Sequence, residues 1–148
     1  MIDPRSQKNI ETLLPKVQPV FSKLLEALQE HFASRGVVPK FISGTRSFAE
    51  QEALYAQGRT KPGPIRTKAR GGQSNHNFGI AVDIGLFQGA DYLEESPLYK
   101  EIGSVVARFP QLEWGGSWEF VDEPHVQWKT GLTLADMRDR ILLGQSIV

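Results

Sequence analysis

The apolar positions of the chain follow a helical period in one region and a strand period in another. Between Val17 and Phe32 apolar residues recur at helical spacing, and Gly36 follows as a helix-ending residue. This segment is the most distinct helix of the sequence. Between Ile80 and Phe87 apolar residues alternate in part with other residues, which indicates a strand. The two periods together predict a mixed protein of the α+β class.

Capping residues, glycines and prolines place the remaining elements. Asp3 before Pro4 is typical of a helix start, and Ser47 with Glu50 forms a capping-box pattern. The expected elements, in chain order, are a helix from Asp3 toward Leu14, the helix from Val17 to Gly36, a β-like segment over Lys40–Thr45, a helix from Ser47 to about Gln57, an irregular loop over 59–75, a strand over Ile80–Phe87, a helix from Ser96 to Phe109, a hairpin or two short strands over Trp114–Trp128, and a helix from Thr133 to about Leu143.

Composition restricts the class of protein. The chain has 148 residues, of which 40% are hydrophobic and 23% charged, and these fractions exclude a disordered protein. The length suits one domain, and no repeat, low-complexity tract or linker divides the sequence. There is no cysteine, which excludes a disulfide framework, a thiolate zinc site, an iron–sulfur cluster and a cysteine nucleophile.

Charge and hydropathy exclude two kinds of partner. Residues 1–72 carry 12 basic and 6 acidic side chains, and the rest carries 5 basic and 11 acidic ones, so the net charge is zero. A nucleic-acid-binding protein is usually basic overall, so we expect no nucleic-acid partner. No apolar run approaches the roughly 18 residues that span a bilayer. The first five residues also lack the layout of a signal peptide. We therefore expect no membrane insertion and a cytoplasmic protein made without a secretion signal.

Two short clusters contain the residue types of a metal-dependent hydrolase. The first runs from Ser74 to Asp83 and includes His76, and the second runs from Asp122 to His125. Hydrolytic zinc uses nitrogen and oxygen ligands, three from the protein, with a fourth position open. Without cysteine, two histidines and a carboxylate are the natural ligand set. A carboxylate three residues before a histidine can lie close to the metal and act as general base.

Local sequence also limits the geometry of these clusters. Asp83 is expected about three residues into a strand, which holds a ligand rigidly. Gly79 and Ala81 leave little side-chain bulk between His76 and this carboxylate. Pro124 argues against a helix in the second cluster, so a turn or a strand must present His125. The site is therefore not the two-histidine helix of the HExxH zinc peptidases.

The spacing of these motifs resembles the M15 metallopeptidases. The pattern Ser-x-His-x-x-Gly-x-Ala-x-Asp at Ser74–Asp83, followed by Asp-x-x-His at Asp122–His125, looks like the D-alanyl-D-alanine carboxypeptidases and L-alanyl-D-glutamate peptidases of that family. The similarity extends to four further segments and so covers nearly the whole chain: Arg5–Ile10, Ser43–Ser47, Gln51–Thr60 and Ala69–Ser74. The branch of phage endolysins and bacterial autolysins fits best.

The resemblance implies a fold, a cofactor and a set of roles. The fold is a small antiparallel sheet with flanking helices, as in D-Ala-D-Ala peptidases and hedgehog proteins. The implied roles are zinc binding by His76, Asp83 and His125, general base catalysis by Asp122, contact with the substrate or transition state by Arg46, and substrate binding by Gln51 and Ser74. The substrate is the peptidoglycan stem peptide, cut between L-alanine and D-glutamate. Residues 1–148 would form one catalytic domain without a separate wall-binding domain, and we expect a monomer.

Other interpretations remain open at this stage. Within the enzymes, the alternative is a D-alanyl-D-alanine carboxypeptidase. Outside them, it is a non-catalytic zinc domain that binds a partner, although a structural zinc would not need Asp122. His31 is interpreted as a structural or solvent-facing residue, and Arg46 has the alternative of a surface ion pair. The basic run from Arg59 to Arg70 is interpreted as a solvated loop rather than a surface that attracts anionic wall polymer.

Overall fold

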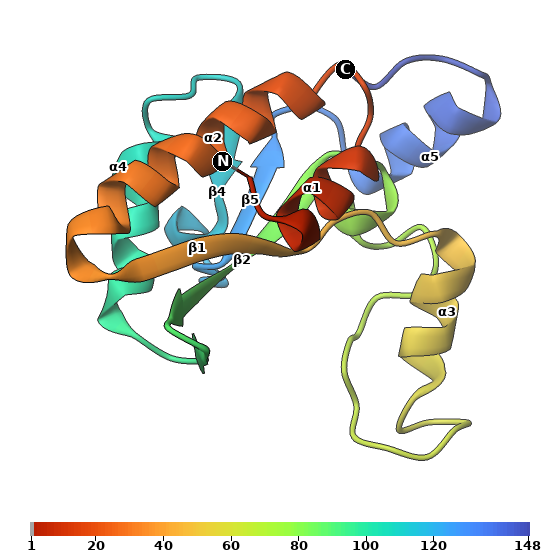
Figure 1. Cartoon of the computed structure of the whole chain (residues 1–148). Helices are drawn as coiled ribbons and strands as arrows, with labels where there is room; N and C mark the ends of the chain where they lie inside the picture. The colour runs from red at the N-terminus through yellow and green to blue at the C-terminus, as the bar shows by residue number, and fades with distance from the viewer. Residues whose placement is uncertain (1) are drawn as a thin grey trace.

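An antiparallel sheet lies at the centre of the computed structural model, which describes residues 2–148 (Figure 1). The strands are β1 Val37–Ser43, β2 Ala81–Gln88, β3 Asp91–Leu93, β4 Leu112–Trp114 and β5 His125–Trp128. Their order is β1-β2-β5-β4. The strand β3 pairs with the C-terminal part of β2, whereas β5 pairs with the N-terminal part of β2. The α-helices are α1 Pro4–Glu11, α2 Gln18–Phe32, α3 Phe48–Ala56, α4 Ile102–Val106 and α5 Leu134–Leu142. This arrangement confirms the expected α+β class.

The longest helix, α2, covers the sheet and forms most of the main core. It packs against β1 and α4, and its large apolar side chains are fully buried: Phe21, Leu24, Leu25, Leu28 and Phe32. The Phe21 ring meets the edge of the Phe41 ring on β1, with centroids 6.3 Å apart. Full burial of one such side chain stabilises a fold by roughly 1.5–3 kcal/mol. A 3-10 turn over Ala33–Arg35 and Gly36 at a φ of +67° then end the helix, as the sequence predicts.

Two helices differ in extent from the expectation. The first helix ends at Glu11 instead of continuing toward Leu14. The Leu14 N–H donates to the Gly79 carbonyl, so this part of the chain is joined to the segment after His76. The expected helix from Ser96 to Phe109 is a 3-10 helix over Pro97–Glu101 that continues into the short α4.

The hairpin made by β2 and β3 was not expected from the sequence. Only three residues form β3, and two of them are exposed, so no apolar alternation marks this strand. At the other end of β2, Ala81, Val82 and Asp83 pair with Gln127, Val126 and His125 of β5. The pairing of Asp83 with His125 places residues 42 positions apart directly opposite each other.

The segment that contains α3 and the following basic loop projects from the body of the molecule (Figure 1). The predicted capping box is present, with the Ser47 hydroxyl accepting from Glu50 N–H and the Glu50 carboxylate accepting from Ser47 N–H. The Gln51 amide donates to the Ala69 carbonyl, and the Glu52 carboxylate pairs with Arg70. These contacts attach the later part of the loop over 59–75 to the helix that precedes the loop.

A second, smaller core lies under the C-terminal helix. Phe78, Ile80, Met137 and Ile147 are buried together there, beside the segment that bears His76. The helix α5 begins at the predicted cap residue Thr133. Among the helices of residues 2–148, none is both long and apolar enough to cross a bilayer.

Candidate metal centre and active site

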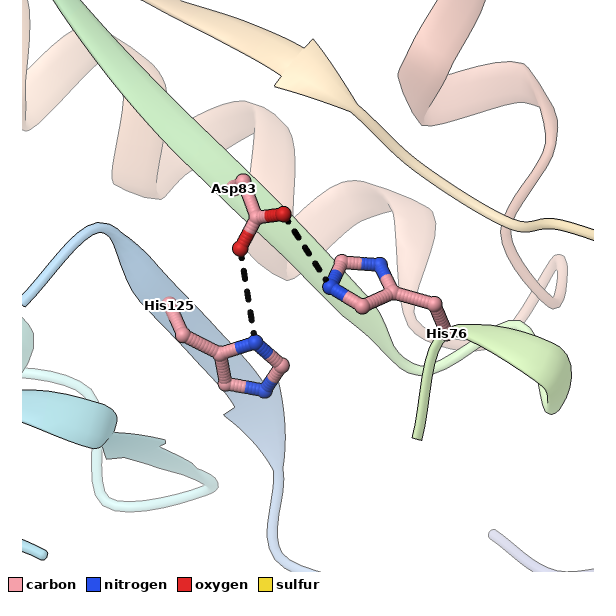
Figure 2. A group of neighbouring side chains, drawn as sticks. All are labelled: His76, Asp83 and His125. Carbon is pink, nitrogen blue, oxygen red and sulfur yellow. Dashed lines mark ion pairs between the residues drawn. The ribbon is translucent and has the colours of Figure 1, made fainter. Parts of the chain in front are cut away.

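Three side chains from separate elements converge beside the two inner strands of the sheet, β2 and β5. Asp83 lies on β2, His125 is the first residue of β5, and His76 lies on a 3-10 turn over Asn75–Asn77 (Figure 2). One ligand atom of each lies within 4.8 Å of the others. The Asp83 carboxylate stands between the two imidazoles, 3.2 Å from His76 Nε2 and 3.4 Å from His125 Nδ1. The structure thus brings together the three predicted zinc ligands.

Backbone and hydroxyl groups orient two of these side chains. The His76 Nδ1 lies 2.9 Å from the Gly44 carbonyl oxygen, which can only accept a hydrogen bond. The His76 proton therefore resides on Nδ1, and Nε2 is left as a free ligand facing Asp83. The Ser43 hydroxyl donates to Asp83 Oδ2 at 2.8 Å. Partners of this kind commonly fix the orientation of metal ligands.

The electrostatics of the group favour an ionised carboxylate. Burial alone would raise the pKa of Asp83, but the adjoining imidazoles of His125 and His76 and the Ser43 hydroxyl outweigh it and lower the pKa far below its usual value. Burial likewise disfavours the charged form of His125, yet the Asp83 carboxylate and Gln127 raise the pKa of that imidazole. Asp83 is therefore an anion between two imidazoles throughout the neutral range.

The donor set fits zinc. Two imidazole nitrogens and one carboxylate oxygen are the ligands of many catalytic zinc sites, which leave a fourth position open. Both histidines are buried, at 5% and 4% exposure, while Asp83 is half-buried. A hollow of about 300 Å³ lies beside the three ligands, so the site is open on one side. Figure 2 shows the two rings approaching one carboxylate from different elements.

Asp122 borders the same hollow, in the turn before β5. Its Oδ2 lies 4.0 Å from His125 Nδ1, close to the ligands but not among them. Partial burial raises the pKa of Asp122, and the negative charge of Asp83 acts in the same direction. The neighbouring Glu123 lines a different hollow, and its backbone carbonyl accepts from the Trp114 indole N–H. Of the two adjacent carboxylates, Asp122 is the one placed to act as a base.

The three expected substrate contacts have different positions. Arg46 and Ser74 line the hollow, whereas Gln51 is fully buried and does not. The Gln51 Oε1 accepts from the Arg46 guanidinium at 3.1 Å, and its amide nitrogen donates to Ala69. Gln51 therefore orients Arg46 from behind, and direct contact of Gln51 with a substrate is not supported. The Ser74 hydroxyl accepts from His76 N–H and so also holds the turn that bears this ligand.

From its position between His76 and Asp83, Gly79 was interpreted as leaving space beside a metal. The structure shows that the backbone conformation requires this glycine instead. Its φ is +72°, a conformation that side-chain-bearing residues rarely adopt. A Cβ atom there would lie 2.9 Å from Leu14 Cγ and 3.0 Å from Leu14 N. The glycine allows the chain to turn from His76 into β2 against the end of the first helical segment.

Sequence reasoning did not single out the residues that orient the ligands. Ser43 and Gly44 lie in a motif that the resemblance included, but nothing local connects them to residues more than 30 positions away. Trp118 also lines the hollow, and its ring centroid lies 5.0 Å from that of the His125 ring. His31 lies elsewhere, hydrogen-bonded to Glu101, which agrees with a structural role.

Comparisons with known proteins agree with this geometry. A profile of the M15 peptidases, described as D-alanyl-D-alanine carboxypeptidase, matches residues 67–128, which contain both clusters. The peptidoglycan L-alanyl-D-glutamate endopeptidase CwlK of Bacillus subtilis (strain 168) is 36% identical over 129 residues, covering 75% of this chain and 72% of CwlK.

Solved structures show the same fold. The L-Ala D-Glu endopeptidase ChiX of Serratia marcescens superposes with a TM-score of 0.55 at 26% identity, covering 86% of this chain and 89% of ChiX. The D,D-pentapeptidase VanY of a VanB-type resistance cassette, solved in complex with Zn(II), has a TM-score of 0.52 at 18% identity, covering 91% of this chain and 81% of VanY. Taken with the identity to CwlK over most of both chains, these findings place the protein in the M15 family of metallopeptidases.

Proposed function

We propose that this protein is a zinc peptidase that cleaves the bond between L-alanine and D-glutamate in peptidoglycan stem peptides. The observation that carries the proposal is the arrangement of His76, Asp83 and His125 around one hollow that Asp122 and Arg46 also line. Two relatives above 25% identity, CwlK and ChiX, are both described as endopeptidases for this bond. The site thus contains the ligands, the base and the cation that peptide hydrolysis needs.

The zinc ion and the side chains of the protein would contribute different parts of the reaction. Zinc held by His76, Asp83 and His125 would supply a Lewis acid that makes a water molecule ionise near neutral pH. The Asp122 carboxylate takes the proton of the attacking water and later gives it to the leaving amine. Partial burial raises the pKa of Asp122, which makes its carboxylate a stronger base than a fully solvated aspartate.

Arg46 supplies the positive charge on the other side of the hollow. None of the ion pairs found within residues 2–148 involves Arg46, so no carboxylate of this part of the chain lies in direct contact with its guanidinium. Gln51 fixes its direction through the contact at 3.1 Å. A guanidinium in this place suits the oxyanion that develops on the scissile carbonyl, or the free carboxylate of D-glutamate next to it.

The shape of the surface favours an endopeptidase. A larger hollow of about 740 Å³ adjoins the first one at Asp122 and is lined by Glu94–Pro97, Tyr99–Lys100 and Val121–Pro124. Both hollows are lined by Asp122, and a substrate that extends past the scissile bond would need a second concave surface of this kind beside the proposed base. A carboxypeptidase instead needs a closed end that receives a terminal carboxylate.

The test is digestion of purified peptidoglycan with the purified protein. Mass spectrometry of the products and dinitrophenyl labelling of new amino termini should identify glutamate as the new N-terminal residue. The His76→Ala variant, purified in the same way, is the control against contaminating hydrolases and should release nothing. New termini on any other residue would contradict the proposed bond.

A D-alanyl-D-alanine carboxypeptidase is the second candidate, because the matching family profile bears that description. It predicts free D-alanine as the only product of the same digestion. This outcome would leave the metal site and the base in place and would change only the substrate. A non-catalytic zinc domain predicts no product from either bond although zinc is bound.

A further inference from the structure

His125 differs from His76 in what holds its second ring nitrogen. The His125 Nε2 lies 2.7 Å from the side-chain oxygen of Gln127, two residues further along β5. Residues two apart on a strand point to the same face, so the amide sits directly beside the imidazole. Gln127 is only 8% exposed and His125 only 4%. Solvent therefore does not compete freely for this hydrogen bond.

A third residue decides which end of the Gln127 amide faces the ring. Glu113 on β4 pairs directly with Gln127 across the sheet, and its carboxylate oxygen lies 2.7 Å from Gln127 Nε2. An ionised carboxylate can only accept hydrogen bonds, so the amide nitrogen must face Glu113. The amide oxygen is thereby turned toward His125, and an oxygen in that position requires a proton on His125 Nε2.

We propose that Gln127 and Glu113 are positioning residues that keep the His125 proton on Nε2, so that Nδ1 stays free to bind the metal. The inference rests on the proposed function, since it takes His125 to be a zinc ligand. Nδ1 is the nitrogen that faces Asp83, 3.4 Å from its Oδ1. If the amide were reversed, its N–H would favour the opposite tautomer, with a proton where the metal must bind.

The first test removes the acceptor beside His125. Gln127→Met keeps an unbranched side chain of similar length but has no amide oxygen. Its zinc affinity, measured by competition with a chromophoric chelator, should fall by about 10- to 100-fold, as is usual when such a partner of a ligating histidine is lost. Unchanged affinity in Gln127→Met, with normal affinity in the parent, would overturn the positioning role alone. A parent that binds no zinc would overturn both this role and the proposed metal site.

The second test keeps the shapes of the two side chains and exchanges their chemical groups. In the double variant Gln127→Glu with Glu113→Gln, an acceptor again faces His125. This variant should bind zinc with an affinity close to that of the parent and well above that of Gln127→Met. Failure of the exchange to restore affinity, in a variant with the parent's thermal stability, would contradict the proposal.

The third test acts at the partly exposed end of the network and does not disturb the core. Glu113→Lys offers only donors, so it should reverse the Gln127 amide and weaken zinc binding, whereas Glu113→Gln keeps an acceptor and should not. Long-range proton–nitrogen spectra of the zinc-loaded parent should show the His125 proton on Nε2. A proton on Nδ1, or equal zinc affinity in the two Glu113 variants, would overturn the inference.

Discussion

At the scale of single residues, the site depends on which atoms are already occupied by the protein. His76 Nδ1 is engaged by the Gly44 carbonyl, and Asp83 Oδ2 is engaged by the Ser43 hydroxyl. The atoms left to bind a metal are one nitrogen on each histidine, facing Asp83, and the oxygens of the Asp83 carboxylate that lie between them. The ligand set is thus defined by hydrogen bonds as much as by residue type.

The first residue-scale prediction concerns metal content. The purified protein should hold about one zinc per chain, whereas His76→Ala and Asp83→Ala should lose it, because three ligands are the usual minimum contribution of the protein. Elemental analysis after dialysis measures this. His31→Ala is the matched control, since His31 is hydrogen-bonded to Glu101 and takes no part in the ligand group. Zinc retained at the parental level in either ligand variant would disprove the assignment.

The second residue-scale prediction concerns the base. Asp122→Ala should lower kcat by about 10²–10⁴-fold and leave zinc content unchanged, because a general base acts in proton transfer and not in metal binding. Glu123→Ala should keep kcat close to that of the parent and change at most KM, since Glu123 lines the neighbouring hollow and not the one beside the three ligands. Steady-state hydrolysis of a synthetic stem peptide compares the two. An inactive Glu123→Ala beside an active Asp122→Ala would show that the neighbouring residue is the base.

At the scale of elements, the turn between His76 and β2 relies on close contact with the segment after α1. Gly79→Ala should lower the free energy of unfolding by more than about 1–2 kcal/mol, the cost of a left-handed backbone alone, since the new methyl would also press on Leu14. Gly89→Ala is the matched control: its φ is +62°, but nothing lies within 4 Å of the added carbon. Urea unfolding should show the larger loss for Gly79→Ala, and equal losses would argue against the contact.

A second element-scale prediction concerns acid stability. Hydrogen bonds from Arg35, and secondarily from His31, lower the pKa of Glu101 to about 2 and join the end of α2 to the 3-10 helix before α4. Since the folded pKa is depressed, this stabilisation is fully present above the unfolded value of about 4.3 and is lost as the pH falls toward about 2.

The comparison of Glu101→Gln with the parent tests this pH dependence. The difference in unfolding free energy between them should be largest near neutral pH and should shrink between pH 4.3 and pH 2. Glu26→Gln is the control. Glu26 is exposed on α2, the helix that contains His31, and takes part in none of the ion pairs found within residues 2–148. A difference that stays constant down to pH 2 would contradict the role of this pair.

At the scale of the whole molecule, the expected localisation stays a prediction. A cytoplasmic peptidase would reach the wall only after the membrane is opened. Expression in a bacterium should therefore cause no lysis until the membrane is permeabilised, and lysis should then be rapid. Turbidity before and after permeabilisation measures this, with the Asp122→Ala variant as control. Spontaneous lysis at low expression, or protein in the medium of intact cells, would contradict it.

The sequence by itself determined the elements whose signals are local. The helical period predicted α2, and Ser47 and Thr133 predicted the starts of α3 and α5. The spacing of the two clusters, through its resemblance to a family, pointed to the three candidate metal ligands that the structure brings together. Pro124 also excluded a helix before His125, as the structure bears out. These features depend on residues a few positions apart, so they can be predicted from the sequence alone.

Only the tertiary structure decided how the ligands are held. The opposition of Asp83 to His125 is set by the register of β2 with β5, and the hydrogen bond from Ser43 to Asp83 depends on the pairing of β1 with β2. Gln51 was expected to contact substrate, but burial places it behind Arg46. Gln127 entered no sequence motif, because its importance comes from a partner on β4. Hydrogen bonds between residues distant in the chain leave no local pattern, and for this reason they became visible only in the folded molecule.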